Sequence, residues 1–244
     1  LPWLVQLAEE VTDLPLCFDT TNLMAIEAAC ETVSKAQPII NSTDCKAERL
    51  ALVPPLAKKY NTKLIGLTMA EGLIPVSAEE RVNLAIERLI PAMVELDFPI
   101  TDLLIDPLVL TVSGCQEYCP ECINAVQMLK FAWDPAPLTN GGLSNVSNAV
   151  LAEMRPLLNR VYLVMLMGAG IDCVIADPRE VEYRNGRLFA GDFPIDLIYK
   201  RVLLSALVDW GGLASDVVRA VRDRAVCMVN PFTCKMLYKK ASLA

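Results

Sequence analysis

The sequence predicts an α/β fold in which helices cover a parallel sheet that curls like part of a barrel. Three observations lead to this prediction. Six short apolar runs each end at a polar residue. Amphipathic stretches, with apolar residues at helical spacing, separate these runs. The runs also recur at intervals that suit one strand and one helix each, which is the pattern of a parallel sheet with crossover helices.

Each predicted strand is short and is followed by a single polar residue. In chain order they are residues 14–18 with Asp19, 38–40 with Asn41, 64–67 with Thr68, 103–105 with Asp106, 141–144 with Asn145 and 173–176 with Asp177. Helices are predicted over residues 4–11, 23–34, 47–60, 78–96 and 117–132.

Six strand–helix units are two fewer than the number that closes a TIM barrel. Because a helix is already predicted from Leu4, we expect the first two strands of such a barrel to be absent from this chain. An open, doubly wound sheet is the alternative, but it usually carries a glycine-rich phosphate loop after its first strand, and the sequence has none. We therefore expect a TIM-barrel-like α/β fold lacking its first two strands.

Composition limits the classes of function. Hydrophobic residues make up 54% of the 244 residues and aromatic residues only 6%, so the core is expected to be large and mainly aliphatic. The net charge of −7 argues against non-specific nucleic-acid binding, which needs a basic surface. No apolar run reaches the length of a membrane span, and Glu9 and Glu10 argue against a signal peptide in residues 1–11.

Cysteine and histidine usage adds a second limit. Nine cysteines, an odd number, without a secretory signal indicate reduced thiols and a cytoplasmic location. The sequence has no histidine, which excludes a Ser-His-Asp triad, a Cys-His pair and a His-ligated zinc within the chain. Acid–base chemistry would therefore depend on carboxylates, Lys, Tyr or Cys.

Residues 178–244 differ from residues 1–177 in charge and in pattern. The first part holds 11 basic and 22 acidic residues, a net charge of −11, and the second holds 11 basic and 7 acidic residues, a net charge of +4. A hairpin is predicted over residues 180–190, with Asn185 and Gly186 at its turn, and a helix over residues 215–224. We therefore expect a boundary near residue 177 and a C-terminal α+β extension, rather than another strand–helix repeat.

The polar residues at the strand ends are expected to converge, because the carboxyl ends of barrel strands form the active face. Carboxylates and amides together can pair with the donors and acceptors of a flat heterocycle such as a pterin. No cluster of Lys or Arg lies at these ends, which argues against a site built around a phosphate. The alternative interpretation is that each polar residue is the N-cap of the following helix.

Several stretches of the chain, taken in order, resemble one family. They are residues 16–22, 40–43, 64–69, 103–108, 134–137, 142–147 and 158–163. This part of the chain resembles the methyltetrahydrofolate–corrinoid/iron–sulfur protein methyltransferases, which share their pterin-binding barrel with dihydropteroate synthases and with the folate domain of methionine synthase. A dihydropteroate synthase is less favoured, because its substrate carries a diphosphate and the strand ends lack basic residues that would bind it.

The resemblance implies roles for particular residues. Asn145 matches the asparagine that contacts the N5 region of the pterin and supports methyl transfer. The pterin-binding positions that the resemblance implies are Asp19, Asn41, Asp106, Asn145, Asn148 and Arg155.

The activity that the resemblance implies is transfer of the N5-methyl group of methyltetrahydrofolate to the cobalt(I) of a corrinoid carried by a partner protein. Asn145 would stabilise the positive charge that develops on N5 through its carbonyl oxygen, with a water delivering the proton. The resemblance also suggests a homodimer. Because two strands are expected to be absent, a folate-binding module without turnover is an alternative.

The C-terminal residues resemble a second kind of protein. Residues 194–203, 229–232 and 239–244 are similar to part of a circularly permuted ATP-grasp protein, which implies that Arg201, Asn230 and Lys240 lie near a nucleotide or substrate. A fragment of an ATP-dependent ligase is therefore a further alternative, and a basic tail packed on the barrel is another. The two resemblances meet near residues 171–178, as expected for a fusion or a composite sequence.

Three cysteines have spacing that deserves comparison with metal sites. Cys115, Cys119 and Cys122 form a C-x3-C-x2-C pattern, but a fourth ligand is not evident and the spacing fits no standard zinc or iron–sulfur pattern. We expect a cluster of thiols at a helix start and no bound metal.

Overall fold

The computed structural model describes residues 2–176, 182–190, 193–195, 197–199 and 227–229, together with residues 216, 219, 220, 223 and 225. Asp177, Arg201, Asn230 and Lys240, to which the sequence assigns possible roles, lie outside the described residues.

The strands are β1 (Cys17–Asp19), β2 (Ile39–Thr43), β3 (Lys63–Leu67), β4 (Leu103–Asp106), β5 (Leu138–Gly142), β6 (Cys173–Ile175), β7 (Glu182–Arg184), β8 (Arg187–Ala190), β9 (Phe193–Ile195), β10 (Leu197–Tyr199) and β11 (Cys227–Val229). The helices are α1 (Pro2–Val11), α2 (Leu23–Thr32), α3 (Ala47–Lys59), α4 (Ala78–Leu84), the π-helical η1 (Ala85–Leu89), α5 (Ile90–Glu95), the 3-10 helix η2 (Ile100–Asp102), α6 (Val112–Cys115), α7 (Tyr118–Leu129), the 3-10 helix η3 (Leu143–Ser147) and α8 (Arg155–Gly168).

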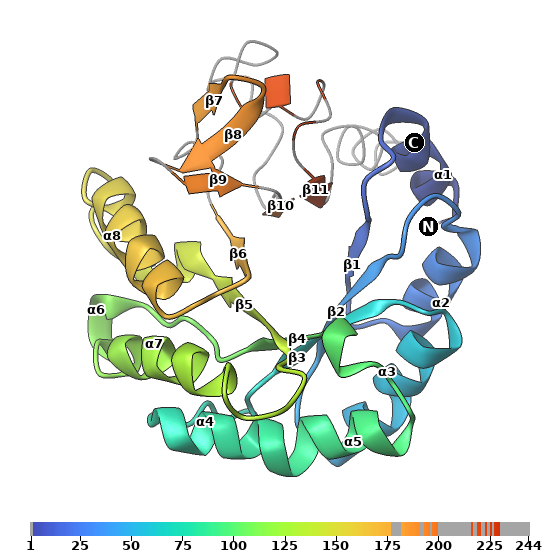
Figure 1. The fold of residues 1–244 in the computed structure, drawn as a ribbon, viewed down its shortest axis with the longest axis horizontal. Coiled ribbons are helices and arrows are strands. Elements are labelled where there is room, and N and C mark those ends of the chain that lie inside the picture. The colour runs from blue at the N-terminus through green and yellow to red at the C-terminus, as the bar shows by residue number, and fades with distance from the viewer. Residues whose placement is uncertain are drawn as a thin grey trace.

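Strands β1 to β6 form one parallel sheet in chain order, and the sheet curls into an open arc with the helices on its outer side (Figure 1). This arrangement confirms the predicted α/β, TIM-barrel-like fold. The predicted helix over residues 78–96 is also confirmed, as the continuous run of α4, η1 and α5.

The strand boundaries differ from the predicted ones in a way that matters for the site. Asp19 and Asp106 are the last residues of β1 and β4, and Asn41 lies within β2, whereas the sequence placed each of them after its strand. Strand β5 begins at Leu138 rather than at residue 141. The prediction missed its first three residues because the polar Thr139 and Asn140 follow Leu138, so these residues do not form an apolar run.

Two apolar layers hold the sheet. Its outward side chains, among them Ile40, Leu64 and Leu103, pack with buried residues of the covering helices such as Ile26 and Leu89. Its inward side chains form a smaller layer at one level of the arc. That layer consists of Cys17, Ile39, Ile65, Leu104, Leu138 and Cys173, one from each strand, with Leu67 beside them.

The described C-terminal residues contain two further sheets. Strands β7, β8 and β9 are antiparallel, and Asn185 and Gly186 make the β7–β8 turn with φ values of 52° and 74°, which confirms the predicted hairpin. Strands β10 and β11 pair in parallel. Asp216, Arg219 and Ala220 are helical and fall within the predicted helix, of which the other residues lie outside the described ones.

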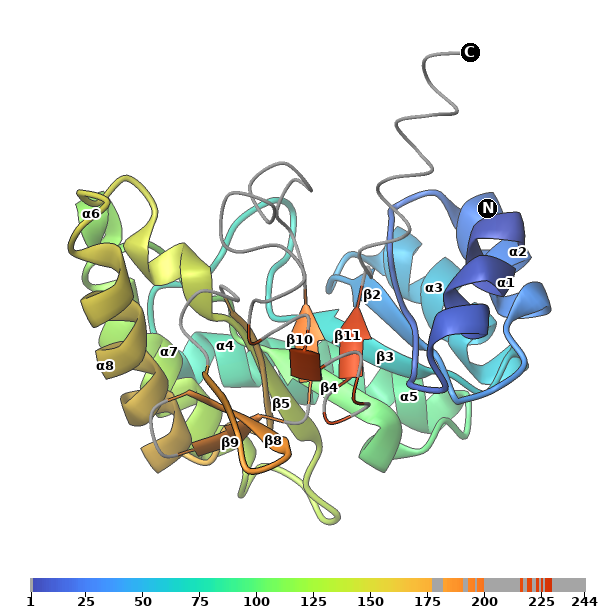
Figure 2. The same ribbon diagram turned by 90° about the horizontal axis from the view of Figure 1, so that it is seen from above.

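Strands β10 and β11 lie in the opening between β6 and β1 (Figure 1), and they are again side by side in the second view (Figure 2). Strand β10 lies against β6. A parallel pair is thus present where a closed barrel would have its two remaining strands. The expectation that residues 178–244 form an α+β extension rather than another strand–helix repeat stays a prediction, because most residues between β10 and β11 lie outside the described ones. Strands of three residues are too short for hydrophobic periodicity to reveal them.

Within the described ranges, every helix is too short or too polar to cross a membrane.

Candidate functional site

The alternation of side chains along the strands generates a polar layer at the carboxyl end of the sheet. Successive strand residues point to opposite faces, so a residue two positions after an inward side chain is also inward. Two positions after the inward Cys17, Ile39, Leu104 and Leu138 come Asp19, Asn41, Asp106 and Asn140. The same step on β3 and β6 gives Leu67 and Ile175. Four polar side chains therefore share one level with two apolar ones.

Asp106 is the most buried carboxyl group of this layer, with 5% of its surface exposed. Its Oδ1 accepts a hydrogen bond from the backbone N–H of Leu108 at 2.8 Å, and its Oδ2 accepts one from Nδ2 of Asn140 at 2.6 Å. Burial raises the pKa of Asp106 to about 6, although these two hydrogen bonds and the charge of Arg81 act in the opposite direction. The carboxyl group can therefore exchange its proton near neutral pH.

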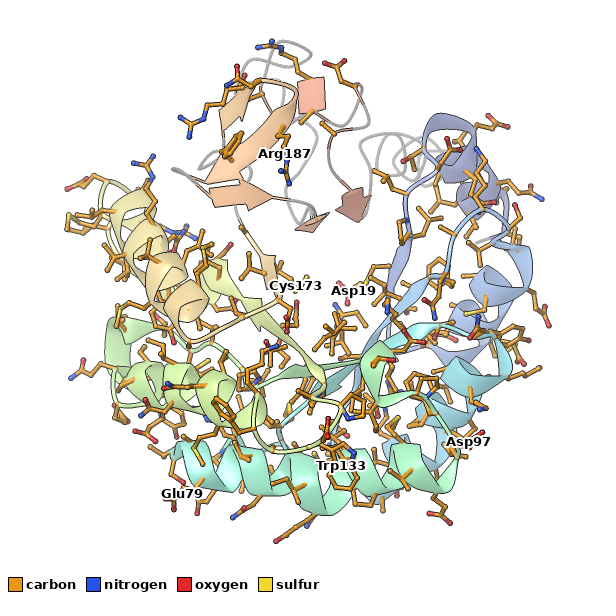
Figure 3. All side chains as sticks on the ribbon, in the orientation of Figure 1. Asp19, Glu79, Asp97, Trp133, Cys173 and Arg187 are labelled. Atoms are coloured by element: carbon orange, nitrogen blue, oxygen red, sulfur yellow. The ribbon has the colours of Figure 1, made fainter. Side chains whose placement is uncertain are left out.

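Asp19 and Asn41 come from β1 and β2, where they are direct neighbours in the parallel register. Asp19 is exposed and is directed into the interior of the arc, as is Cys173 of β6, whereas Glu79 and Asp97 lie on the outer, helical side (Figure 3). Nearby, the guanidinium of Arg49 donates to the carbonyl oxygens of Thr21 at 3.3 Å and Ser42 at 2.7 Å. Arg49 thereby connects the segments that follow Asp19 and Asn41.

The N-cap interpretation of these residues is wrong for the helices that follow β1, β3 and β4. The side-chain caps of α2, α4 and α6 are Asn22, Ser77 and Thr111. Asp19, Thr68 and Asp106 each precede these caps along the chain, so their side chains are not used to begin a helix. Thr68 is fully buried and bonds to the backbone oxygen of Asp106, which makes it a connection between β3 and β4.

Asn145 lies in η3, directly after β5, and its position depends on Gly142. A Cβ atom at Gly142 would lie 2.8 Å from Nδ2 of Asn145, so the amide packs against a space that only glycine leaves open. Oδ1 of Asn145 accepts a long hydrogen bond of 3.4 Å from Nδ2 of Asn148. Nε of Arg155 donates to Oγ of Ser147 in the same segment at 3.3 Å. The structure thus brings Asn145, Asn148 and Arg155 together around one short turn.

Arg81 of α4 is completely buried and supports the loops beside Asp106. Its guanidinium donates to the carbonyl oxygens of Pro75 and Pro107 at 2.9 Å and of Leu108 at 3.3 Å. It thereby joins the loop after β3 to the loop after β4. Sequence analysis did not single out Arg81, because a lone arginine on an amphipathic helix looks like a surface residue.

Asn140 was also missed from the sequence, because residue 140 was placed before the fifth strand instead of inside it. Its side chain is 1% exposed and makes the hydrogen bond to Asp106 described above. The alternation of Leu138 and Asn140 is the signal that could have identified it.

The thiols of Cys115, Cys119 and Cys122 lie at and near the start of α7. Sγ of Cys119 donates to the carbonyl oxygen of Leu110 at 3.5 Å, and burial raises the pKa of Cys122 to about 12. Among the described residues, no three His, Cys, Asp or Glu side chains are grouped as metal ligands. Cysteines free of disulfides are Cys17, Cys30, Cys45, Cys115, Cys119, Cys122 and Cys173.

A parallel α/β arc with polar side chains at the carboxyl ends of its strands is the architecture of TIM-barrel-like enzymes, which bind their ligands at that face. The sequence profile described as "Pterin binding enzyme" matches residues 1–177. The chain therefore belongs to the pterin-binding enzyme family.

Curated relatives with related names support this assignment at low identity. The chain is 23% identical over 194 residues to a methylcorrinoid:tetrahydrofolate methyltransferase of Eubacterium limosum, covering 79% of this chain and 69% of the relative. It is 29% identical over 181 residues to a methionine synthase of Mycobacterium leprae, covering 70% of this chain and 15% of that protein. The chain thus spans only a small part of the methionine synthase that it matches.

Solved structures show the same fold. The dihydropteroate synthase of Xanthomonas albilineans in complex with 7,8-dihydropteroate has a TM-score of 0.51 and 18% identity, with 70% of this chain and 63% of that chain covered. The same enzyme in complex with indole-2-carboxylic acid and 6-chloroguanine has a TM-score of 0.50 and 17% identity, over 70% and 62% of the two chains. At this identity the likeness concerns the fold alone.

Proposed function

We propose that this chain binds methyltetrahydrofolate at the carboxyl ends of β1 to β6 and passes its N5-methyl group to the cobalt(I) of a corrinoid carried by a partner protein. The observation that carries the proposal is the inward polar layer of Asp19, Asn41, Asp106 and Asn140. Family membership and the name of the Eubacterium limosum relative, which describes the same transfer in the opposite direction, support it.

The layer suits a pterin better than a phosphorylated ligand. The four polar side chains are carboxylates and amides, and none of the inward residues described at this level is Lys or Arg. Carboxylates accept hydrogen bonds from the amino-pyrimidine edge of a pterin, and amides can both donate and accept. Leu67 and Ile175 would border the flat faces of the ring. Asn148 and Arg155 would contribute from the turn after β5.

In this proposal, the corrinoid would supply the cobalt nucleophile that accepts the methyl group. A water first delivers a proton to N5, and the C–N5 bond then breaks, with its electron pair left on nitrogen, as the new bond to the methyl carbon forms. Asp106, held by Leu108 and Asn140, binds and orients the ring. Asn145 presents its carbonyl oxygen to N5 and stabilises the positive charge that develops there before the bond breaks. Preorganised polar stabilisation of this kind is worth about 3 kcal/mol.

The test separates binding from transfer. Methyltetrahydrofolate is titrated into the full chain and into Asp106→Ala, Asn145→Ala and Glu79→Ala, the last being a carboxylate on the outer side (Figure 3). Asp106→Ala is expected to weaken binding by about tenfold to a hundredfold, because it removes a charged acceptor. Asn145→Ala is expected to bind but to transfer the methyl group to a cobalt(I) corrinoid about a hundredfold more slowly.

Glu79→Ala is expected to match the unsubstituted chain in both measurements. A folded chain that does not bind methyltetrahydrofolate would refute the proposal. Binding without transfer, at any corrinoid concentration, would leave a folate-binding module without turnover.

A further inference from the structure

The carbonyl oxygen of the Asn140 side chain is buried and has no hydrogen-bond partner in the structure. The residue is 1% exposed. Desolvating an amide oxygen without a hydrogen bond is unfavourable, and buried polar atoms in folded proteins are nearly always paired. An orphaned acceptor in the inward polar layer therefore points to a donor that arrives with a ligand.

The orientation of this amide is fixed by its neighbour. Nδ2 of Asn140 donates to Oδ2 of Asp106 at 2.6 Å. A carboxylate has only acceptors, so it selects the nitrogen of the amide and turns the oxygen away from itself. Asn140 lies two positions after the inward Leu138, and Gly141 and Gly142 follow it in β5. The free oxygen therefore belongs to the inward polar layer and is held rigidly.

We propose that Asn140 is a further ligand-binding residue whose side-chain oxygen accepts a hydrogen bond from an N–H group of the bound pterin, while its nitrogen positions Asp106. The inference rests on the proposed function, which supplies the ligand. Asp106 and Asn140 then form a pair of adjacent acceptors, one charged and one neutral. Such a pair matches two neighbouring N–H donors on one edge of a heterocycle, and it rejects a ring that carries acceptors at those places.

The experiment compares methyltetrahydrofolate binding by the full chain, Asn140→Val and Thr62→Val. Valine has no polar side-chain atoms, so the substitution removes both hydrogen-bonding groups of Asn140. Thr62 is the matched control, because its hydroxyl oxygen is also buried and unpartnered but lies directly before β3, at the opposite end of the strands. Thermal unfolding of each protein without ligand checks that the fold is retained.

Asn140→Val is expected to bind methyltetrahydrofolate about tenfold more weakly or worse, because a ligand N–H is left without its acceptor. Thr62→Val is expected to keep the affinity of the unsubstituted chain. A second readout is the pH dependence of binding. Since the hydrogen bond from Asn140 lowers the pKa of Asp106, the midpoint for binding should move to higher pH in Asn140→Val.

Asn140→Asp provides a second variant should Asn140→Val fail to fold. It keeps an acceptor in the same place, and at low pH one proton shared with Asp106 replaces the original hydrogen bond. Its affinity is therefore expected to recover as the pH falls, whereas that of Asn140→Val is not.

The outcomes are distinguishable. Equal affinity of the unsubstituted chain and Asn140→Val would overturn the role of Asn140 and leave the proposed function intact. An Asn140→Asp affinity that is independent of pH would overturn it as well. No binding of methyltetrahydrofolate by the folded, unsubstituted chain would overturn both.

Discussion

At the scale of single residues, the hydrogen-bonded pair of Asp106 and Asn140 is central to the proposed site. A buried carboxyl group is tolerated only when hydrogen bonds compensate for the lost hydration. Asp106 receives two, from Leu108 and Asn140, and still has a pKa raised to about 6 by its burial. The folded chain therefore holds a proton that an ordinary carboxyl group would have released at lower pH.

This proton predicts how stability depends on pH. The folded pKa of about 6 lies above the reference value of 3.8, so Asp106 contributes stability that is fully present below about pH 4 and is lost as the pH rises through 6. The contribution is about 3 kcal/mol. Urea unfolding at pH 4 and pH 7 should show this decrease in the unsubstituted chain. Asp106→Asn should lack it, and equal pH dependence in both would contradict the raised pKa.

The close approach of the Asn145 side chain to Gly142 predicts a separate effect on catalysis. A Cβ at this position would collide with the side chain of Asn145, so Gly142→Ala should displace the amide and slow methyl transfer by about tenfold or more. Methyltetrahydrofolate affinity should change less than the rate. Gly168→Ala is the control, because no atom lies within 4 Å of its added Cβ. A transfer rate unaffected by Gly142→Ala would argue against a role for the Asn145 geometry.

At the scale of elements, the sequence predicts the strand–helix alternation, but it predicts only part of the inward polar layer. Asp19, Asn41 and Asp106 end clear apolar runs, so the sequence located them near the correct end of the sheet. Asn140 was hidden because β5 contains Thr139, Asn140 and two glycines, which do not look like a strand. The role of Asn140 depends on its hydrogen bond to Asp106 of the neighbouring strand β4, and only the folded chain brings these two residues together.

The contribution of α4 to the site could not be foreseen, because Arg81 bonds to carbonyl groups distant in sequence. Its replacement predicts a large effect. Arg81→Met should lower the free energy of unfolding by about 3–5 kcal/mol, since Pro75, Pro107 and Leu108 would each lose a hydrogen bond to a buried charge. Denaturant unfolding measures the loss. Arg160→Met, on the exposed part of α8, should change stability little.

At the scale of the whole molecule, the described part of the C-terminal segment lies where the arc of β1 to β6 is open (Figures 1 and 2). We propose that residues 178–244 act as part of the barrel rather than as an independent domain. A chain ending at residue 176 should then expose the edges of β1 and β6, which favours association between chains. Light scattering should detect aggregation of this piece and not of the full chain. A monomeric, stable piece would favour an independent C-terminal domain.

The suggested homodimer also has a candidate surface. Leu157, Val161 and Val164 of α8 are 57%, 50% and 52% exposed and lie on one face at helical spacing. We expect Val161→Glu to shift the chain toward the monomer in size-exclusion chromatography. Leu52→Glu, at an equally exposed position of α3, should leave the oligomeric state unchanged. Identical elution of Val161→Glu and the unsubstituted chain would exclude this face as the contact.

The position of β10 and β11 also affects the order in which the molecule can fold. Strand β10, which begins at Leu197, lies against β6 and pairs with β11, which begins at Cys227. This part of the fold therefore depends on residues that are synthesised last. The arc of β1 to β6 can form while the later residues are still being synthesised, and the pairing of β10 with β11 beside β6 must wait for them. During that interval both edges of the arc present unpaired backbone N–H and C=O groups, so association between unfinished chains is favoured most at that stage of synthesis.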